Sequence, residues 1–225
     1  TSVLFLVAWH FLLYMTAQLF EFSPAVAEWL GLRRAHRFLS GLTLGAVVFG
    51  ITLSTLHQSG LGALYMMAAP KIHPLWYSEF IPLLFFVSSI FAGLSLVILE
   101  GSISRHVFAD RLDPELEQSH APILVGLARV CGATMFVYLF LKAIEFLHGQ
   151  HWTHMSGFYG AWFLVEVGIL VALPMVLFLY GASRERVGLI RTAAIVALVG
   201  VILNRLNISI IAFKWYETSH YVPSW

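Results

Sequence analysis

The chain has 225 residues, of which 59% are hydrophobic and only 11% are charged, and its formal net charge is +1. Soluble globular domains carry about 25% charged residues, so the composition excludes an ordinary soluble protein, and the small net charge gives no reason to expect nucleic acid as a partner. The single cysteine, Cys131, excludes an internal disulfide, a CxxCH haem attachment and a cysteine-ligated cluster within this chain.

Six apolar segments follow one another, each long enough to cross a bilayer, because about 20 helical residues span the hydrocarbon core. We expect them at residues 3–20, 38–56, 80–99, 123–147, 158–180 and 187–213. Segments in lipid must pair their backbone groups internally, so the predicted fold class is an all-α, polytopic helical bundle. Pro82 falls in a first turn, whereas Pro174 is interior and is expected to kink its helix. The start at Thr1 within an apolar run suggests a fragment of a longer chain.

Cationic side chains are distributed unequally between alternate loops. One side of the membrane carries eight arginines, namely Arg33, Arg34, Arg37, Arg105, Arg111, Arg184, Arg186 and Arg191. The other side carries only Lys71 and Lys214. By the positive-inside rule, the arginine-rich loops are cytoplasmic.

Histidine and aromatic residues gather on the predicted outer side. The histidines are His57, His73, His148, His151, His154 and His220, and the aromatic residues are Trp76, Tyr77, Trp152, Trp215, Tyr216, Tyr221 and Trp225. An interfacial aromatic belt accounts for the Trp and Tyr residues. It does not account for the excess of titratable histidines on that side.

Four charged residues fall inside the apolar segments, namely Lys142, Glu145, Glu166 and Arg205, with Asn204 and Asn207 beside the last. An isolated charge in lipid is costly, so these side chains are expected to face one another or a wet cavity. Lys142 and Glu145 are three residues apart on one helix face and can pair directly. Two interpretations stay open: an ion network that stabilises helix packing, or a proton pathway.

The second segment closes with "LHQSG", which places His57, Gln58 and Ser59 together. A quinone ring has two carbonyl acceptors that become hydroxyl donors on reduction, so its site needs groups that donate and accept. A helix end with unpaired carbonyls suits such a ligand. The alternative is a polar cap, with Gly60 ending the helix.

Neither haem nor metal is expected in this chain. A b-type haem needs two facing imidazoles, and only His10 lies well inside a segment. The run "HGQHWTH" spaces three histidines evenly, but its glycine favours a turn over a metal site.

Several stretches carry a family resemblance: "STLHQSGLGALY", "KIHPLWY", "GLSLVILEG", "LFEFSP" and "NRLNISIIAF" followed by "YVPSW". They closely resemble the HybB-like branch of the NrfD/polysulfide-reductase membrane-subunit family, which includes a nickel–iron hydrogenase membrane subunit and subunits of related respiratory complexes. The resemblance runs from about Ser2 to Trp225. It implies a protein of about ten helices in two four-helix bundles.

The resemblance also implies a division of the chain. Residues 1–56 would complete the first, quinone-side bundle, residues 57–79 would form an extracytoplasmic loop, and residues 80–225 would form the second bundle with an outer C-terminal segment. A ferredoxin-like iron–sulfur subunit would bind on the outer side and connect the chain to a catalytic subunit, such as a hydrogenase or another respiratory enzyme. The expected cofactor is menaquinone, and the implied location is the lipid of the cytoplasmic (inner) membrane of a bacterium or an archaeon.

Roles for single residues are carried over from the same resemblance. Quinone binding is expected at His57, Gln58, Ser59, His10 and Tyr14; a proton pathway at Lys142, Glu145, Glu166, Arg205, Asn204 and Asn207; and the partner interface at His73, Trp76 and Tyr77. The chain departs from the family at Leu6, where HybB-type sequences can carry a functionally important glutamate. His10 lies one turn further on the same face and is our hypothesis for its replacement.

The predicted function is therefore that of a quinone-reactive membrane subunit of an oxidoreductase complex, rather than an enzyme on its own. It would pass electrons between the iron–sulfur partner and menaquinone, with proton translocation as a further possibility. Two alternatives remain, an ion or solute transporter and a passive membrane anchor. A transporter would be favoured by paired broken helices related by a repeat, and only Pro174 suggests a break.

Overall fold

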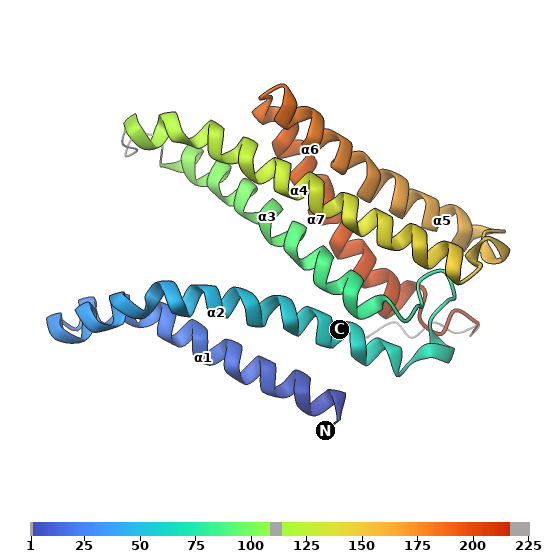
Figure 1. The fold of residues 1–225 in the computed structure, drawn as a ribbon, viewed down its shortest axis with the longest axis horizontal. Coiled ribbons are helices and arrows are strands. Elements are labelled where there is room, and N and C mark those ends of the chain that lie inside the picture. Colours follow the sequence, from blue (N-terminus) through green and yellow to red (C-terminus); the bar gives the residue numbers. More distant parts are fainter. Residues whose placement is uncertain (1, 109–113, 217–225) are drawn as a thin grey trace, which may run out of the picture. The chain divides into compact units, whose positions relative to one another are not determined.

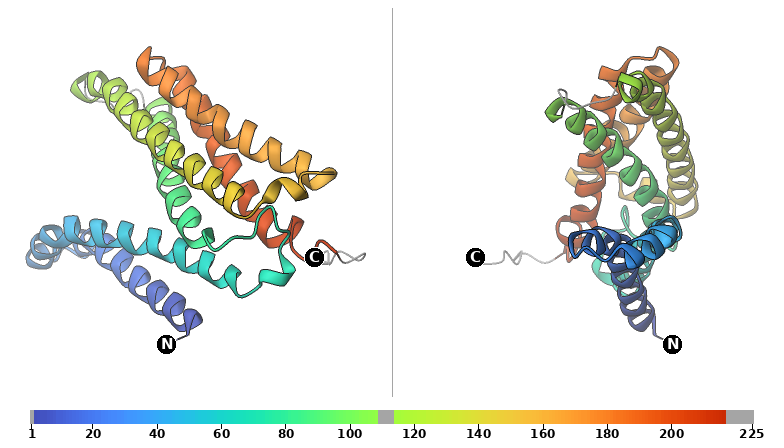
Figure 2. Two further views of the ribbon diagram at one scale, coloured as in Figure 1. Left: turned by 45° about the vertical axis from the view of Figure 1, so that its right-hand side comes forward. Right: turned by 90° about the vertical axis from the view of Figure 1, so that its left-hand side faces the viewer.

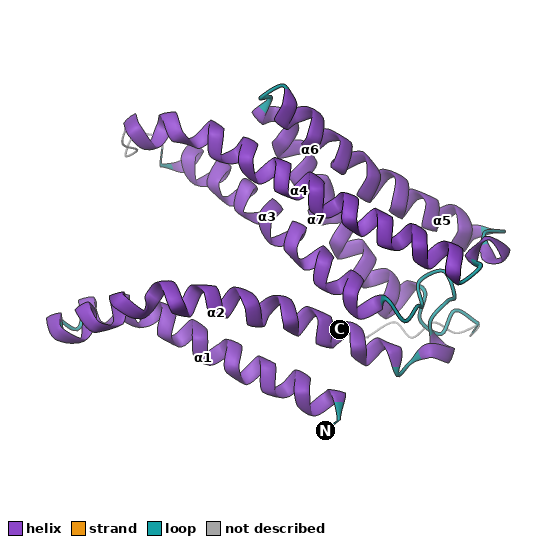
Figure 3. Ribbon diagram, viewed as in Figure 1, coloured by secondary structure: helices purple, strands orange, loops and turns teal. Residues whose placement is uncertain are grey.

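The computed structural model describes residues 2–108 and 114–216, with the backbone alone for residues 114–119. Helix is its main regular structure, and the described residues form no strand beyond one isolated bridge between Ile72 and Phe213 (Figure 3). The predicted all-α fold is confirmed, because six helices within the described residues are long and apolar enough to cross a membrane. Arg111, His220, Tyr221 and Trp225 lie outside the described residues.

The chain divides into two compact units, Thr1–Met67 and Ala68–Trp225. The first unit holds α1 (Val3–Trp29) and α2 (Arg33–Met66) (Figure 1). The second holds α3 (Ile81–Val107), α4 (Pro114–His148), α5 (Phe158–Val167), α6 (Leu173–Ser183) and α7 (Val187–Leu206). π-helical turns at Gly168–Ala172 and Asn207–Ile211 join α5 to α6 and extend α7.

In the first unit, two helices lie against each other through small residues. The chain reverses at Gly31, whose φ of +71° is a conformation that glycine adopts freely. Gly50 faces Ala17 at 3.9 Å, and Gly60 faces Val7 at 3.0 Å, each distance measured to an ideal Cβ on the glycine. Such close approach without side chains is typical of helix packing in lipid.

The first helix runs nine residues beyond its expected end at residue 20, through Pro24. Proline has no N–H, so the carbonyl of Phe20 loses its usual helical partner. The Ser23 hydroxyl donates to that carbonyl at 2.7 Å and pairs it instead. The helix therefore continues at little cost.

The second helix corrects a prediction. We expected a helix end at residue 56 and a loop from residue 57, but α2 continues to Met66. "LHQSG" is therefore neither a helix end nor a cap, and the interhelical loop begins ten residues later than expected. The cause is that polar residues at a membrane surface need not break a helix, and "GLGALYM" contains no proline to stop it.

The second unit is a bundle of α3, α4, α5–α6 and α7, which run alternately in opposite directions (Figures 1 and 2). Its apolar core includes the fully buried Ile98, Met135, Phe178 and Ala193. Small residues let α7 come close to its neighbours, because a Cβ on Gly200 would lie 2.5 Å from the carbonyl oxygen of Leu170. Leu170 lies four residues before Pro174, which has no N–H to donate to the Leu170 carbonyl oxygen. The π turn at Gly168–Ala172 and the close approach of Gly200 therefore both occur where this helical hydrogen bond is missing.

The second unit has two unlike ends. We call residues 69–80, 148–158 and 207–216 the aromatic end, and residues 101–108 and 183–191 the arginine end. The aromatic end includes both Lys71 and Lys214, and the arginine end includes Arg105, Arg184, Arg186 and Arg191. Among the described residues, the cations in the loops of this unit are thus distributed as the sequence predicts, with the arginines at one end and the two lysines at the other.

Candidate functional site

A buried carboxylate, Glu166 of α5, is the centre of a polar network in the second unit. It is only 3% exposed. Trp76 Nε1 donates to Oε2 at 2.6 Å, Asn204 Nδ2 donates to Oε1 at 2.6 Å, and Asn207 Nδ2 donates to Oε2 in a short bond. Trp162 Nε1 in turn donates to Asn207 Oδ1 at 2.9 Å. Three N–H groups therefore donate to the buried carboxyl group of Glu166, so that neither of its oxygens is left without a hydrogen-bond partner.

Arg205 joins this network through one intermediate residue. Its Nη1 donates to Asn204 Oδ1 at 2.7 Å, and its Nη2 donates to Ser88 Oγ at 2.7 Å. The guanidinium also lies 3.5 Å from the ring centroid of Phe85, a cation–π contact. Asn204 thus connects the cation to the Glu166 carboxylate, and the predicted proximity of these residues is confirmed.

Lys142 and Glu145 form the expected ion pair on α4, with Nζ 2.8 Å from Oε2. Both side chains are buried. Oε2 of Glu145 is therefore held by the lysine, whereas Oε1 is buried without a partner. Both oxygens of Glu166 thus accept hydrogen bonds, whereas Oε1 of Glu145 is open to a further hydrogen-bond donor such as water.

Tyr138 is a member of the network that sequence reasoning missed. It is buried on α4 within electrostatic range of Lys142, Glu166, Arg205 and Glu145. Its spacing was a usable signal, because positions 138, 142 and 145 share one helix face. Tyr138, Ser88 and Asn204 also line a small cavity between the helices, with room for about one water molecule.

His151, in the turn after α4, lies beside the ion pair. Its ring packs against Gly149, its Nδ1 is buried without a hydrogen-bond partner, and it interacts electrostatically with both Glu145 and Lys142. Burial lowers the pKa of His151; Glu145 raises it, and Lys142 and His154 lower it further. The side chains of Glu145 and His151, each with a buried atom that lacks a hydrogen bond, therefore interact electrostatically where α4 meets the aromatic end. Among the described residues, no group of three His, Cys, Asp or Glu side chains is arranged to hold a metal ion.

The segment containing "HPLWY" is not the open surface that we expected. His73 is 5% and Trp76 is 1% exposed, and only Tyr77 of the three predicted interface residues is partly accessible. The His73 ring stacks on Tyr159 at 4.7 Å and meets Trp215 edge-on at 4.7 Å. The segment folds onto its own bundle because Trp76 can bury a large apolar ring while its N–H pairs with Glu166.

His73 makes the stability of this end dependent on pH. Burial, His154 and His151 lower its pKa from 6.5 to about 4. Between these values the unfolded chain binds a proton that the folded chain does not, so stability should fall as pH falls from about 6.5 to 4. His73→Phe keeps an aromatic ring and should flatten that pH dependence, measured as thermal unfolding of the detergent-solubilised complex. The same substitution at the exposed His148 is the control; an equal effect there would contradict the assignment.

In the first unit, His57 faces α1 rather than a loop. Its ring lies 6.0 Å from the ring of Phe11, and its Nδ1 is buried without a partner. Gln58 and Ser59 follow it within one continuous helix, about 100° and 200° further around the axis. We expected the three side chains to form one polar cluster, but they point in different directions. Of the three, only His57 has a buried side-chain atom without a hydrogen-bond partner, its Nδ1.

The other predicted quinone residues lie on α1. His10 Nδ1 donates to the carbonyl oxygen of Leu6 at 2.8 Å, and the tautomer with its hydrogen on Nδ1 has Nε2 as an acceptor. Tyr14 Oη accepts a hydrogen bond from Gln18 Nε2 at 2.6 Å, so its own hydroxyl hydrogen can be donated elsewhere. These groups can accept and donate hydrogen bonds within one helix pair.

Membrane-length helices around a buried ion network define a multi-pass integral membrane protein. The chain belongs to the NrfD family, because the family model described as "Polysulphide reductase, NrfD" matches residues 1–213. The predicted family is thereby confirmed.

The relatives that match the chain include proteins of two bacteria and an archaeon. A protein of Nitratidesulfovibrio vulgaris is 40% identical over the whole chain, which covers 58% of its length. The probable Ni/Fe-hydrogenase 2 b-type cytochrome subunit of Escherichia coli is 29% identical over the whole chain, which covers 56% of it. The Hdr-like menaquinol oxidoreductase integral membrane subunit of Archaeoglobus fulgidus is 27% identical over 76% of the chain and 42% of its own length. The chain thus spans about half the length of these relatives, and no solved structure matches it.

Proposed function

We propose that the chain is part of a quinone-reactive membrane subunit of a respiratory oxidoreductase complex, which exchanges electrons between an extracytoplasmic iron–sulfur partner and menaquinone. The observation that carries the proposal is the buried, unpaired Nδ1 of His57 at the interface of α1 and α2. Buried polar atoms are normally paired, so this nitrogen calls for a ligand or a further protein group. The family membership and the menaquinol oxidoreductase relative support a quinone as that ligand.

The residues of the first unit suit the polar head of a quinone. A quinone supplies the two-electron, two-proton chemistry, and the protein supplies hydrogen bonds and proton transfer. His57 is proposed to hold a proton for one head-group oxygen. His10 Nε2 or the Tyr14 hydroxyl is proposed to serve the other, through the groups that their present bonds leave open. The apolar helix faces around them suit an isoprenoid tail.

The intact complex in native membranes tests the proposal. It should reduce a menaquinone analogue, or be reduced by the corresponding quinol, at a rate well above that of membranes lacking this chain. A complex that reacts with an artificial dye but not with any quinone would contradict the proposal. The visible spectrum of the same sample reports any b-type haem, which the name of the Escherichia coli relative raises and which our proposal does not use.

We also propose that protons move through the second unit by way of Glu145 and His151, with Lys142 as the neighbouring charge. Support comes from the buried atoms without partners on Glu145 and His151. Glu166, by contrast, is held by three donors and is better suited to stabilise the bundle. Of the six residues predicted for a pathway, Glu145 thus has the open positions that proton transfer needs.

Replacing both members of the ion pair tests this pathway. Lys142→Met combined with Glu145→Gln leaves no uncompensated charge, so the complex should assemble with a thermal midpoint that is unchanged or raised. Proton uptake coupled to quinone reduction should become slower by about a hundredfold if the pair relays protons. The measurement is a pH-dye assay in vesicles, with dye reduction by the catalytic subunit as the control. Normal proton uptake in the double variant would remove the pair from the pathway.

A further inference from the structure

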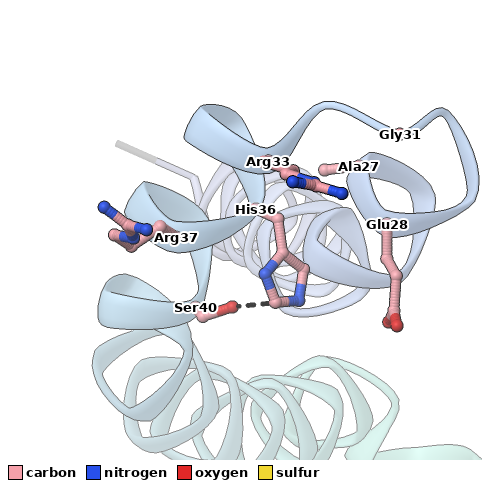
Figure 4. A pocket seen from close by; sticks show the side chains of 7 residues that line it. All are labelled: Ala27, Glu28, Gly31, Arg33, His36, Arg37 and Ser40. Carbon is pink, nitrogen blue, oxygen red and sulfur yellow. Dashed lines mark hydrogen bonds between the residues drawn. The ribbon is translucent and has the colours of Figure 1, made fainter.

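A polar pocket opens where α1 ends and α2 begins, in a part of the first unit that the proposed function does not use. It has a volume of about 520 Å³ and is lined by Ala27, Glu28, Gly31, Arg33, His36, Arg37 and Ser40 (Figure 4). Pockets for small ligands have volumes of about 300–1,000 Å³, so this space is large enough for a head group of that size.

The pocket has an excess of positive groups. Arg33 and Arg37 form no ion pair or side-chain hydrogen bond within the described part of the chain, and the lining contains one carboxylate, Glu28. Figure 4 shows Arg33 extending from α2 toward the last turn of α1, and His36 joined to Ser40 by a hydrogen bond of 3.5 Å. In the same view Arg37 points to the other side of His36, so Arg33 is the guanidinium placed to bind phosphate oxygens and Arg37 adds positive charge nearby.

The backbone adds to this preference for an anion. The pocket lies at the first turn of α2, a helix of 34 residues, and no side chain caps its N-terminus. The first N–H groups of a helix carry partial positive charge and lack intrahelical partners. Although the N–H of Arg33 already donates to the Gly31 carbonyl oxygen, the partial positive charge of this helix end favours the same kind of ligand as the arginine side chains.

The surroundings indicate that the ligand is a lipid rather than a dissolved ion. Both helices are long and apolar enough to cross a membrane, and the pocket lies at the turn that joins them. Large apolar side chains adjacent in sequence to the pocket residues are exposed: Trp29 by 85%, Leu30 by 57% and Phe38 by 69%. Acyl chains can lie along such a surface while the phosphate reaches the arginines.

We propose that this pocket binds the phosphodiester head group of an anionic phospholipid. The inference is independent of the quinone proposal, since none of the residues involved takes part in it. Basic pockets at helix ends are a recurrent way of binding anionic lipids, and each nearby arginine contributes about fivefold in affinity. The carboxylate of Glu28 repels an anionic ligand, so a variant that removes this charge should strengthen binding rather than weaken it.

Native mass spectrometry of the solubilised, intact complex can count bound lipid during titration with phosphatidylglycerol or phosphatidylcholine. We expect phosphatidylglycerol to be preferred. Arg33→Gln should weaken its binding about fivefold and the Arg33→Gln/Arg37→Gln double variant about 25-fold. Glu28→Gln should strengthen it. Arg34→Gln is the matched control, because it removes the same charge from the same helix turn but does not line the pocket.

Three results would overturn the proposal. Equal loss in the Arg34→Gln control would show that only the general surface charge matters. Equal binding of phosphatidylcholine would show that charge does not select the lipid. Displacement of phosphatidylglycerol by inorganic phosphate at equal concentration would identify a site for a free anion. If Arg33→Gln does not assemble, the strengthened binding of Glu28→Gln, or its absence, still decides the question.

Discussion

His57→Ala is expected to slow quinone-linked electron transfer by about a hundredfold while the complex remains assembled. The reason is local: His57 is a titratable group with a buried and unpaired nitrogen at the interface of α1 and α2. Alanine removes both the hydrogen bond and the exchangeable proton. The loss of a partly buried ring beside Phe11 should have a smaller effect on stability than on the reaction, since the nitrogen has no protein partner to lose.

The measurement compares quinone reduction with dye reduction in the same membranes. His57→Ala should impair the first and leave the second unchanged, and His57→Gln should retain part of the hydrogen bonding but not the proton exchange. The pH profile of the quinone reaction should therefore change shape in both variants. A rate equal to the wild type in His57→Ala would exclude this side chain from the quinone site and direct attention to His10.

Matched controls follow from the helical geometry. Gln58→Ala and Ser59→Ala change polar residues of the same stretch that point in other directions from α2. Each should change the quinone rate by less than about threefold, well below the loss expected at His57. Losses as large as that of His57→Ala would instead indicate that the whole stretch contributes, as the sequence had suggested.

Much of the fold could be predicted from the sequence because lipid imposes a simple rule. A run of about 20 apolar residues has to be a helix, so the number of crossings and the positions of the second unit's helices follow from composition and length. The pairing of Lys142 with Glu145 was equally accessible, because it depends only on spacing along one helix. The end of α2 was not, since a helix that leaves the hydrocarbon region stops only where caps or prolines stop it.

The candidate site was harder because its bonds connect distant segments. Trp76 and Glu166 are 90 residues apart, and their contact depends on how the loop before α3 folds onto α5. Nothing in "HPLWY" distinguishes a buried segment from an interfacial one, since tryptophan and tyrosine are common at both places. The open atoms of Glu145 and His151 likewise became visible only when the surrounding bonds were known.

Glu166→Gln is expected to lower the stability of the second unit by about 3–5 kcal/mol, the usual cost of removing one partner from a buried charged group. Glutamine keeps one acceptor oxygen but places an NH₂ group where donors now point. Trp76, Asn204 and Asn207 all donate to this carboxylate, so at least one of their N–H groups would face another donor. Arg205 would also lose a nearby negative charge, since Asn204 bridges its guanidinium and the Glu166 carboxylate.

Trp76→Phe provides the comparison, because it removes one N–H while retaining a large aromatic ring. Its cost should be about 1–3 kcal/mol, that of one charge-assisted hydrogen bond. The combined variant should cost less than the sum of the two, because a bond can be lost only once. Thermal unfolding in detergent, followed by tryptophan fluorescence and by assembly of the complex, measures all three. Additive effects would contradict a direct bond between Trp76 and Glu166.

The same variants separate a structural role of Glu166 from a role in proton transfer. If Glu166 only stabilises the bundle, the fraction of Glu166→Gln that assembles should take up protons at the normal rate per electron. Trp76→Phe should then be fully coupled as well, since it leaves the carboxylate in place. We expect normal proton uptake in both variants, because both oxygens of Glu166 already accept hydrogen bonds from the protein. Glu145 differs, because its Oε1 has no partner. Slow proton uptake in assembled Glu166→Gln would extend the pathway to the centre of the second unit.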